Sequence, residues 1–270
     1  MRFFVPEPAR AAAFFLLIST ADHAQTGPTS PPQSSHPLTT SKRGLEDTTA
    51  SCGHPFGLRQ GQDLEYQLLD TKSKPVGTWR YSVLSVSRDS TGKKKPVPTT
   101  KVRLKSGFYD LRNRVLQQQD LSYFCRQDTT FTDGLGEINY AGLKSFRDRR
   151  LVYQGTPLAW PNQPAVGSRL APGGAAVQVS SPSVSIAKVT TTLSQRRVLS
   201  GPAPVTVPAG TFNCYAVESQ REMATAARVD LVLKSGGREI NYYSPAVGIV
   251  KTEYFDKNNK LLQTRVLSKR

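Results

Sequence analysis

Histidine, the side chain that most often moves protons in enzymes, is scarce in this sequence of 270 residues. The three histidines are His23, His36 and His54, and only His54 follows the first fifty residues. A Ser-His-Asp or Cys-His arrangement needs an imidazole that takes and returns a proton. The common zinc sites need several His and Cys ligands. The sequence therefore predicts no histidine-dependent catalysis, no metal site and no cofactor.

A pair of carboxylates could still act without histidine, with one as the acid and the other as the base or nucleophile of a glycosidase. Asp128, Asp133 and Glu137 cluster together, alongside aromatic residues. An Asp-Gly dipeptide inside this cluster is typical of a turn, so a polar loop explains the same residues. The cluster also lacks the ligand spacing of a defined calcium loop. We predict no catalytic residue here and keep the carboxylate-pair enzyme as an alternative.

The cysteines are Cys52, Cys125 and Cys214, an odd number. In an oxidising compartment they allow one disulfide and one leftover thiol. Cys214 shares a strand face with Phe212 and Ala216 and has the pattern of a small buried hydrophobic residue. Cys52 begins the body of the chain and Cys125 ends a predicted strand, so we predict a Cys52–Cys125 disulfide. The spacing alone does not exclude the other pairings.

The part of the chain that carries Asp128, Cys125 and the other residues above is preceded by a predicted export signal. Residues 1–24 contain a basic start with Arg2 and Arg10, an apolar run at residues 11–18 and then small residues. This is the layout of a secretory signal peptide, and the apolar run is too short to span a bilayer. Cleavage could follow Ala21 or Ala24, and we favour Ala24. We expect a periplasmic or secreted protein without a transmembrane segment in its mature form.

Residues 25–50 are Thr, Ser, Pro and Gly with almost no large apolar side chain. Such a segment cannot bury enough surface to offset its ordering entropy, so we predict a flexible tether. Residues 51–270 are long enough for one full core, and no later stretch repeats the tether composition. We therefore predict a single domain over residues 51–270.

Short runs of alternating apolar and polar residues, rich in Val, Thr, Tyr and Phe, dominate this domain and are typical of strands. We predict strands at residues 63–71, 78–88, 98–109, 115–126, 175–181, 183–199, 212–222, 227–234, 238–243, 247–255 and 260–268. No segment after residue 25 sustains a helical period. Residues 134–174 contain four prolines and are predicted to form a long excursion across one end of the sheet.

Three turns share one pattern, in which an Asp is followed four positions later by a basic residue. An Asp that opens a turn accepts hydrogen bonds from the backbone amides ahead of it. Asp70, Asp110 and Asp256 are therefore predicted to be structural residues of β-hairpins. Pro208 and Gly210 predict a further tight turn, because proline presets one torsion and glycine adopts the left-handed conformation that closes it.

Consecutive hairpins predict an all-β fold, a curved antiparallel sheet that is half-barrel or barrel-like. Trp79 and Tyr81 alternate along one predicted strand, as residues that fill a core do. Trp160 lies beside Pro161 in the irregular middle segment. If the sheet is hollow, we expect Trp160 at the mouth of the ligand cavity.

The net charge of +16, at a sequence pI near 10.0, is spread along the chain. Anionic surfaces should attract such a protein. Because the protein is predicted to be exported, we expect no nucleic-acid partner. The expected partners are an anionic envelope lipid or glycan, with peripheral membrane contact, and a solvated basic surface is the simpler alternative.

Cys52 stands before Pro55-Phe56 and is followed by Gly61, Glu65-Tyr66 and Cys125. The run from Val207 to Tyr215 comes later, and then the run from Val247 to Glu253 with the Asp256 hairpin. Together these motifs resemble the TapB family of exported β-rich bacterial proteins. It covers most of residues 52–267, and residues 206–215 are its most specific segment.

The resemblance implies an all-β domain with a curved antiparallel sheet, located in the envelope or secreted. It implies no established activity and no catalytic residues. The chain departs from the family pattern in its basic charge, its long tether and its shorter, Pro-rich middle section. These departures leave open whether any ligand is shared.

The sequence thus favours an exported non-enzymatic β-module that binds an apolar or anionic cell-envelope component, or a protein partner. The alternatives are the carbohydrate-active enzyme with a carboxylate pair and a purely structural envelope or adhesion accessory protein. Ligand identity and oligomeric state are not encoded in any motif of the chain.

The disulfide is testable by thiol alkylation of the unfolded mature protein without reductant. We expect no more than one cysteine to be labelled, because a disulfide does not react with the reagent. Mass spectrometry counts the labels, and the same reaction after reduction should give three. Three labels before reduction would reject the bridge.

Overall fold

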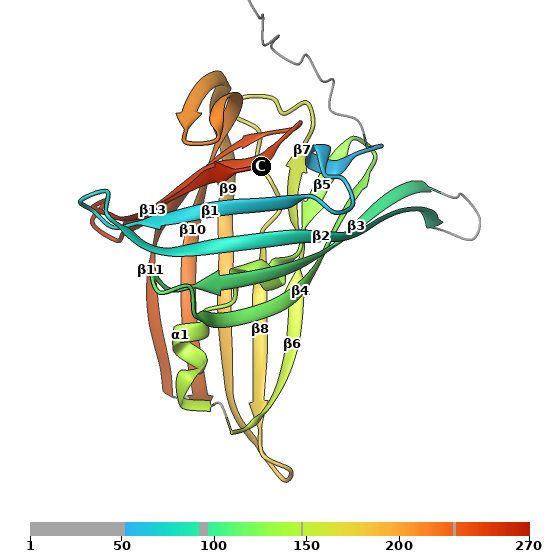
Figure 1. The fold of residues 1–270 in the computed structure, drawn as a ribbon. Coiled ribbons are helices and arrows are strands. Elements are labelled where there is room, and N and C mark those ends of the chain that lie inside the picture. The colour runs from blue at the N-terminus through green and yellow to red at the C-terminus, as the bar shows by residue number, and fades with distance from the viewer. Residues whose placement is uncertain (1–51, 92–96, 147, 229–230) are drawn as a thin grey trace, which may run out of the picture. The chain divides into compact units, whose positions relative to one another are not determined.

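The structure, a computed structural model, describes residues 52–91, 97–146, 148–228 and 231–270 (Figure 1). The predicted signal peptide at residues 1–24 and tether at residues 25–50 lie outside these ranges, as do His23 and His36. Both segments stay predictions.

A sheet of 13 strands makes up almost all of the described part of the chain. The strands are β1 (Asp63–Leu69), β2 (Pro75–Thr91), β3 (Val97–Tyr109), β4 (Val115–Arg126), β5 (Thr129–Thr132), β6 (Arg150–Thr156), β7 (Leu158–Pro161), β8 (Gly173–Ser180), β9 (Ser185–Val207), β10 (Gly210–Arg228), β11 (Leu231–Ser244), β12 (Gly248–Asp256) and β13 (Leu261–Lys269). Four short helical segments accompany them, namely η1 (Pro55–Gly57), η2 (Gly134–Glu137), α1 (Tyr140–Leu143) and η3 (Lys144–Phe146).

The strand order is β6-β8-β9-β10-β11-β12-β13-β1-β2-β3-β4-β5-β7, and the paired strands are antiparallel. The two edges of this order, β6 and β7, are consecutive in sequence and are separated only by Pro157. The chain therefore steps from one edge of the sheet to the other, and the sheet curls into a nearly closed, barrel-like form (Figure 1). The prediction of a curved, all-β antiparallel sheet is confirmed.

Residues 134–174, predicted as a long excursion across one end of the sheet and given no strand, contain β6 and β7, so this prediction is wrong. Strand β6 is a sheet edge with almost every side chain exposed, so it lacks the alternation that identifies a half-buried strand. Strand β7 has only four residues and ends at a proline. The four-residue strand β5 was also not predicted.

The predicted break between strands 227–234 and 238–243 is also wrong, because β11 runs unbroken from Leu231 to Ser244. Gly236 and Gly237 suggested a turn at this point. A Cβ atom on Gly237 would lie 2.0 Å from the carbonyl oxygen of Phe255 on the neighbouring strand. The glycine therefore permits close approach of two backbones within the sheet.

The core fills the concave inner face of the sheet. Strand β3 shows the pattern, since Val102 and Leu104 are buried while Lys101, Arg103 and Lys105 are exposed. The inner-face positions of the other strands contribute, among others, Leu64, Tyr66, Tyr81, Val83, Leu121, Leu193, Val217, Tyr243, Val250 and Leu267. A smaller cluster lies near α1 and contains Leu143, Val177, Val179, Ala187 and Val189.

The turns opened by Asp70, Asp110 and Asp256 have one shared geometry. In each, the Asp Oδ1 accepts hydrogen bonds from the backbone amides two and four positions later, at 2.8 to 2.9 Å. The fourth residue of each turn is left-handed, namely Ser73, Asn113 and Asn259, with φ of 58°, 59° and 61°. The hydrogen bond from the backbone amide four residues later is the main cause of the lowered pKa of Asp70 and of Asp110. The turn geometry accounts for all three carboxylates.

A fourth turn joins β9 to β10 at residues 208–209. Pro208 occupies it, and Gly210 follows at φ 135°, a conformation that side chains rarely adopt. The backbone amide of Ala209 donates to the carbonyl of Leu267 at 3.2 Å, which ties this turn to β13.

A disulfide joins Cys52 to Cys125, the pair that the sequence favours. Cys125 lies fully buried at the end of β4, so the bridge attaches the start of the described chain to the sheet. Cys214 is a free, buried cysteine. Burial raises the pKa of its thiol to about 12, so it is unreactive in the folded protein.

No helix in the described ranges is long and apolar enough to cross a membrane.

Candidate functional site

A partly open cavity lies inside the curved sheet, on its inner face. Its polar lining includes Tyr66, Tyr81, Tyr123, Glu137 and Arg265, and apolar side chains complete the wall. The cavity has about 40 Å³ for the centres of water molecules. At roughly 10 to 15 Å³ per water, this is room for about three waters.

Four strands of one continuous stretch of the sheet, from β13 to β4, place the tyrosines and Arg265 of the lining. Tyr66 on β1 and Tyr81 on β2 point inward, and their rings meet edge to face with centroids 5.6 Å apart. Tyr123 on β4 lies on the same face two strands further on. Arg265 on β13 pairs in register with Leu68 of β1 on one side and Thr252 of β12 on the other.

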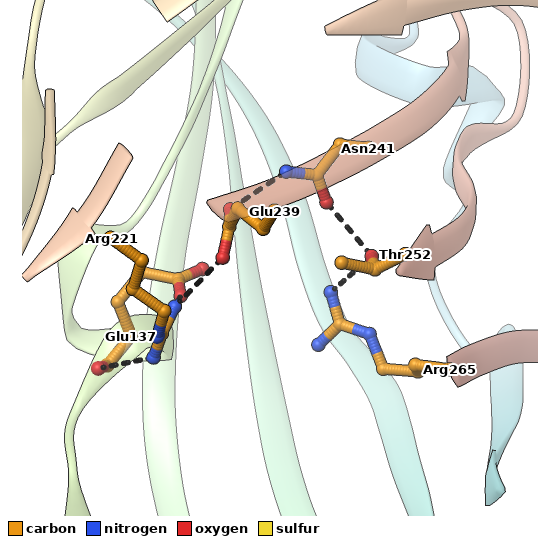
Figure 2. A network of polar contacts seen from close by, with 6 residues as sticks. All are labelled: Glu137, Arg221, Glu239, Asn241, Thr252 and Arg265. Carbon is orange, nitrogen blue, oxygen red and sulfur yellow. Dashed lines mark hydrogen bonds and ion pairs between the residues drawn. The ribbon is translucent and has the colours of Figure 1, made fainter. Parts of the chain in front are cut away.

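A buried ionic network adjoins the cavity. Arg221 Nη1 on β10 donates to Glu137 Oε2 at 2.6 Å and to Glu239 Oε2 at 3.0 Å. Glu239, on β11, is only 2% exposed. Figure 2 shows the Arg221 guanidinium lying between the two carboxylates. Because a buried charge without a partner is costly, this guanidinium is what allows Glu239 to be buried and Glu137, whose side chain is 18% exposed, to lie partly buried beside it.

The network continues across the inner face from strand to strand (Figure 2). Asn241 Nδ2 donates to Glu239 Oε1 at 2.8 Å, and Thr252 Oγ1 donates to Asn241 Oδ1 at 2.8 Å. Arg265 Nη2 then donates to Thr252 Oγ1 at 3.2 Å. The register explains the row, since Asn241 faces Thr252 and Thr252 faces Arg265 across adjacent strands.

The two acids of the network respond differently to their surroundings. Burial acts to raise the pKa of Glu137, but the positive charges of Arg221 and Arg265 outweigh it and lower this pKa. For Glu239, burial prevails over Arg221, and the nearby Glu137 adds to it, so its pKa is raised. Glu239 is therefore the carboxyl group of the pair that takes up a proton more readily.

Arg265 has no carboxylate partner among the described residues. Its Nε is shielded from solvent without a hydrogen-bond partner, and its guanidinium carbon lies 5.6 Å from the centre of the Tyr66 ring. Burial would lower its pKa, but nearby tyrosines and Glu137 raise it overall, so Arg265 stays charged. Burial also raises the pKa of the Tyr66 and Tyr123 phenols. The cavity lining therefore combines this cation and neutral hydroxyl groups with the carboxylates of Asp133 and Glu137, which are bound by backbone amides and by Arg221.

The predicted acid cluster does not converge on one point. Asp128 Oδ1 accepts a hydrogen bond from Asn162 Nδ2 at 3.0 Å. Asp133 lines the cavity, but its carboxylate accepts from the backbone amides of Leu135 and Ser122. Only Glu137 joins the network, and its acidic neighbour there is Glu239.

Sequence reasoning missed Glu239 and Arg265 as site residues. The signal that could have pointed to the network is the alternation of side chains between the two faces of a strand. Glu239 and Asn241 fall on one face, and Ile240 and Tyr242 fall on the other. Both Glu239 and Asn241 are buried, so the polar residues of this strand occupy its core-facing phase. Polar residues at core-facing positions mark an internal network more often than a surface.

The prediction that Trp160 lies at the mouth of a ligand cavity is wrong. Trp160 is 1% exposed, and its indole Nε1 donates to Thr132 Oγ1 at 2.9 Å. Its ring meets Tyr243 edge to face at 5.2 Å, and the guanidinium of Arg196 lies over it at 4.7 Å. The unrecognised strand β7 directs this side chain into the core.

Arg196 is a second buried cation, separate from the cavity lining. Its Nη1 donates to the carbonyl of Ala171 at 3.1 Å and its Nη2 to that of Ala159 at 3.0 Å. Burial lowers its pKa to about 10, so it remains protonated at neutral pH. It fastens β7 and the segment that follows it to β9.

His54, the histidine within the described residues, is exposed, and these residues contain no group of three or more His, Cys, Asp or Glu side chains that could hold a metal ion.

The chain belongs to the DUF3108-like family, whose profile matches residues 59–267. Two crystal structures are similar in fold. A predicted lipoprotein from Parabacteroides distasonis ATCC 8503 has a TM-score of 0.62 and 21% identity, over 80% of this chain and 98% of that one. A predicted exported protein with a YmcC-like fold from Bacteroides fragilis NCTC 9343 has a TM-score of 0.57 and 16% identity, with the same coverage. No curated protein matches the chain.

The ionic network predicts a strong and pH-dependent effect of Arg221→Met. Removing the guanidinium leaves two buried carboxylates uncompensated, so we expect about 3 to 5 kcal/mol less unfolding free energy at pH 7. Without the cation, the pKa of both Glu137 and Glu239 rises in the folded state. The deficit should therefore shrink between about pH 7 and pH 5 as the folded protein takes up protons.

Urea unfolding at each pH measures this effect. Arg197→Met is the matched control, because it removes an exposed arginine paired with Glu218 at 3.5 Å. It should change the unfolding free energy by less than about 1 kcal/mol at every pH. A similar loss in both variants, or a deficit for Arg221→Met that grows on acidification, would contradict the assignment.

Proposed function

We propose that this DUF3108-like protein is an exported, non-enzymatic binding module that receives the anionic end of a cell-envelope component in its tyrosine-lined cavity. The observation that carries the proposal is Arg265, a guanidinium at the cavity wall without a carboxylate partner among the described residues. A guanidinium binds carboxylates and phosphates in a planar, two-pronged geometry. The hydroxyls of Tyr66 and Tyr123 supply further donors around it.

The size of the cavity restricts the ligand to an end group. The volume of about 40 Å³ for water centres suits a carboxylate or phosphate group that displaces about three waters. Pockets for whole drug-sized ligands are roughly 300 to 1,000 Å³. The remainder of the envelope component would therefore stay outside the cavity.

The charge balance of the network supports binding with proton uptake. Arg221 and Arg265 offset Glu137 and Glu239 when all four groups are ionised. A bound anion adds one negative charge, and Glu239, whose pKa is already raised, is the group placed to neutralise it. Affinity should consequently rise as the pH falls toward the pKa of Glu239.

Export is supported by three independent features. The predicted signal peptide spans residues 1–24, and the Cys52–Cys125 disulfide suits an oxidising compartment. The two similar structures are described as a predicted lipoprotein and a predicted exported protein. Within the DUF3108-like family, we propose that the chain is related to the TapB group, because the motifs described above within residues 52–267 resemble that group.

The proposal predicts that Arg265→Met weakens binding of acetate and inorganic phosphate about 10- to 100-fold, the value of a hydrogen-bonded charge pair. NMR titration of the full-length mature protein measures the affinity, at pH 7 and at pH 5.5. Arg80→Met is the control, because Arg80 pairs with Glu65 at 3.0 Å outside the cavity lining. The control should bind like the unaltered chain. Equal affinities for all three proteins would refute the site.

A second candidate, the carbohydrate-active enzyme, is favoured by one observation. Glu137 and Glu239 contact the same nitrogen of Arg221, and their pKa values are shifted in opposite directions, as in acid–base pairs. Against it, Arg221 occupies the space between the acids, and the cavity is too small for a sugar ring.

Hydrolysis assays with aryl glycosides separate the two candidates. We expect no turnover above background for the intact chain, or for Glu137→Gln and Glu239→Gln. Turnover by the intact chain that either substitution abolishes would establish the enzyme and overturn the binding module.

A further inference from the structure

The three turns opened by aspartates lie at the same end of the sheet. They belong to the hairpins β12–β13, β1–β2 and β3–β4, and these six strands are consecutive neighbours in the sheet. Antiparallel pairing of β13 with β1 and of β2 with β3 directs all three hairpins the same way. Figure 1 shows these hairpin ends together at the left of the view. We call residues 70–76, 110–116 and 256–262 the turn rim.

The turn rim is a continuous row. Neighbouring strands lie about 4.8 Å apart, so neighbouring hairpins are about 10 Å apart and three of them span roughly 20 Å. The row is braced, because Arg80 Nη1 on β2 donates to Asn113 Oδ1 in the β3–β4 turn at 2.7 Å. This bond holds the β3–β4 turn against β2, and the Asp Oδ1 hydrogen bonds hold each of the three turns internally.

The turn rim carries more cations than anions. Its six basic residues are exposed, namely Lys72, Lys74, Arg112, Arg114, Lys257 and Lys260. Its three acids are the turn aspartates, whose Oδ1 atoms accept backbone hydrogen bonds. Arg114 is paired with Asp110 at 2.7 Å, and the other five basic residues have no ion pair within the described chain. These five are available to an anionic partner.

Exposed apolar side chains accompany the cations. Of the 13 large hydrophobic residues that are exposed in the described ranges, five fall within the turn rim. They are Val76 (38% exposed), Leu111 (69%), Val115 (52%), Leu116 (58%) and Leu262 (47%). Scattered apolar residues need no explanation, but apolar groups gathered with cations at one protruding edge mark an interaction surface.

We propose that the turn rim docks the protein onto the surface of an anionic lipid bilayer. A membrane interface offers negative head groups to the lysines and arginines, and acyl chains just beneath them to leucine and valine. A nucleic acid or an acidic glycan would use the cations but leave Leu111 and Leu116 in water. The combination of both kinds of side chain on braced turns therefore selects the bilayer.

The proposal is independent of the interior cavity, since no turn-rim residue lines it. The apolar tips are already exposed, so docking requires no unfolding of the sheet. The protein would then attach reversibly, because several cations and a few shallow apolar contacts provide peripheral binding and not insertion.

Vesicle cosedimentation of the full-length mature protein tests the rim. Lys72→Glu, Arg112→Glu and Lys257→Glu together should lower partitioning onto phosphatidylglycerol-containing vesicles roughly a hundredfold, because each cation lost near the surface weakens binding about fivefold. Partitioning of the unaltered chain should fall with rising salt and be weak on phosphatidylcholine alone. The control combines Arg59→Glu, Arg103→Glu and Arg150→Glu, three exposed arginines outside the rim with the same change of net charge. On a logarithmic scale, its loss of partitioning should be less than half of the loss seen for the rim variant.

A second variant, Leu111→Ser with Leu116→Ser, tests the apolar part. It should bind anionic vesicles about tenfold more weakly and keep the salt dependence of the unaltered chain. Equal binding to anionic and neutral vesicles, an equal loss in the control, or no effect of the leucine changes would overturn the bilayer assignment. The last result, with retained binding to heparin, would point to a soluble polyanion instead.

Discussion

Buried charge is the constraint on which the interior of this sheet depends. The sheet curls so far that Glu137 and Glu239 leave water, and Arg221 between them makes this possible. Glu137 comes from η2, 84 residues before Arg221 in the chain. The ion pair therefore ties η2, which packs against β6 and β8, to β10 and β11, and one interaction both neutralises the interior and links segments far apart in the chain.

The same network determines what the cavity can do. Glu137 and Glu239 are committed to Arg221, whereas Arg265 ends the row of polar contacts with Thr252 and has no carboxylate partner in the part of the chain that the structure describes. This asymmetry leaves a cation facing a small, tyrosine-lined space. The cations of the turn rim differ in kind, because they are solvated and widely spaced. An interior cation acts at short range on one chemical group, while the rim acts on an extended surface.

Local patterns predicted much of the fold and little of the site. Alternation located the strands of the three aspartate hairpins, and each Asp with its downstream amides formed the expected turn. Strand β6 was not predicted, because the side chains of an exposed edge strand do not alternate between apolar and polar. Trp160 was placed wrongly because β7 was not recognised as a strand. The acid cluster around Asp133 was prominent by proximity in sequence. The acidic neighbour of Glu137 nevertheless came from β11 and the cation between the two acids from β10, and no local pattern links either strand to Glu137.

The sequence by itself determined the all-β class, the hairpin turns, the cysteine pair favoured for the disulfide and the basic charge, because each depends on neighbouring residues or on composition. Tertiary structure alone decided which polar side chains face inward together, where the chain crosses between the sheet edges at Pro157, and which basic residues gather at one end. These properties depend on strand order and register, which bring residues far apart in the chain within a few ångströms of each other. Electrostatic and hydrogen-bond energies depend on those distances and on burial, and neither is written in any single segment.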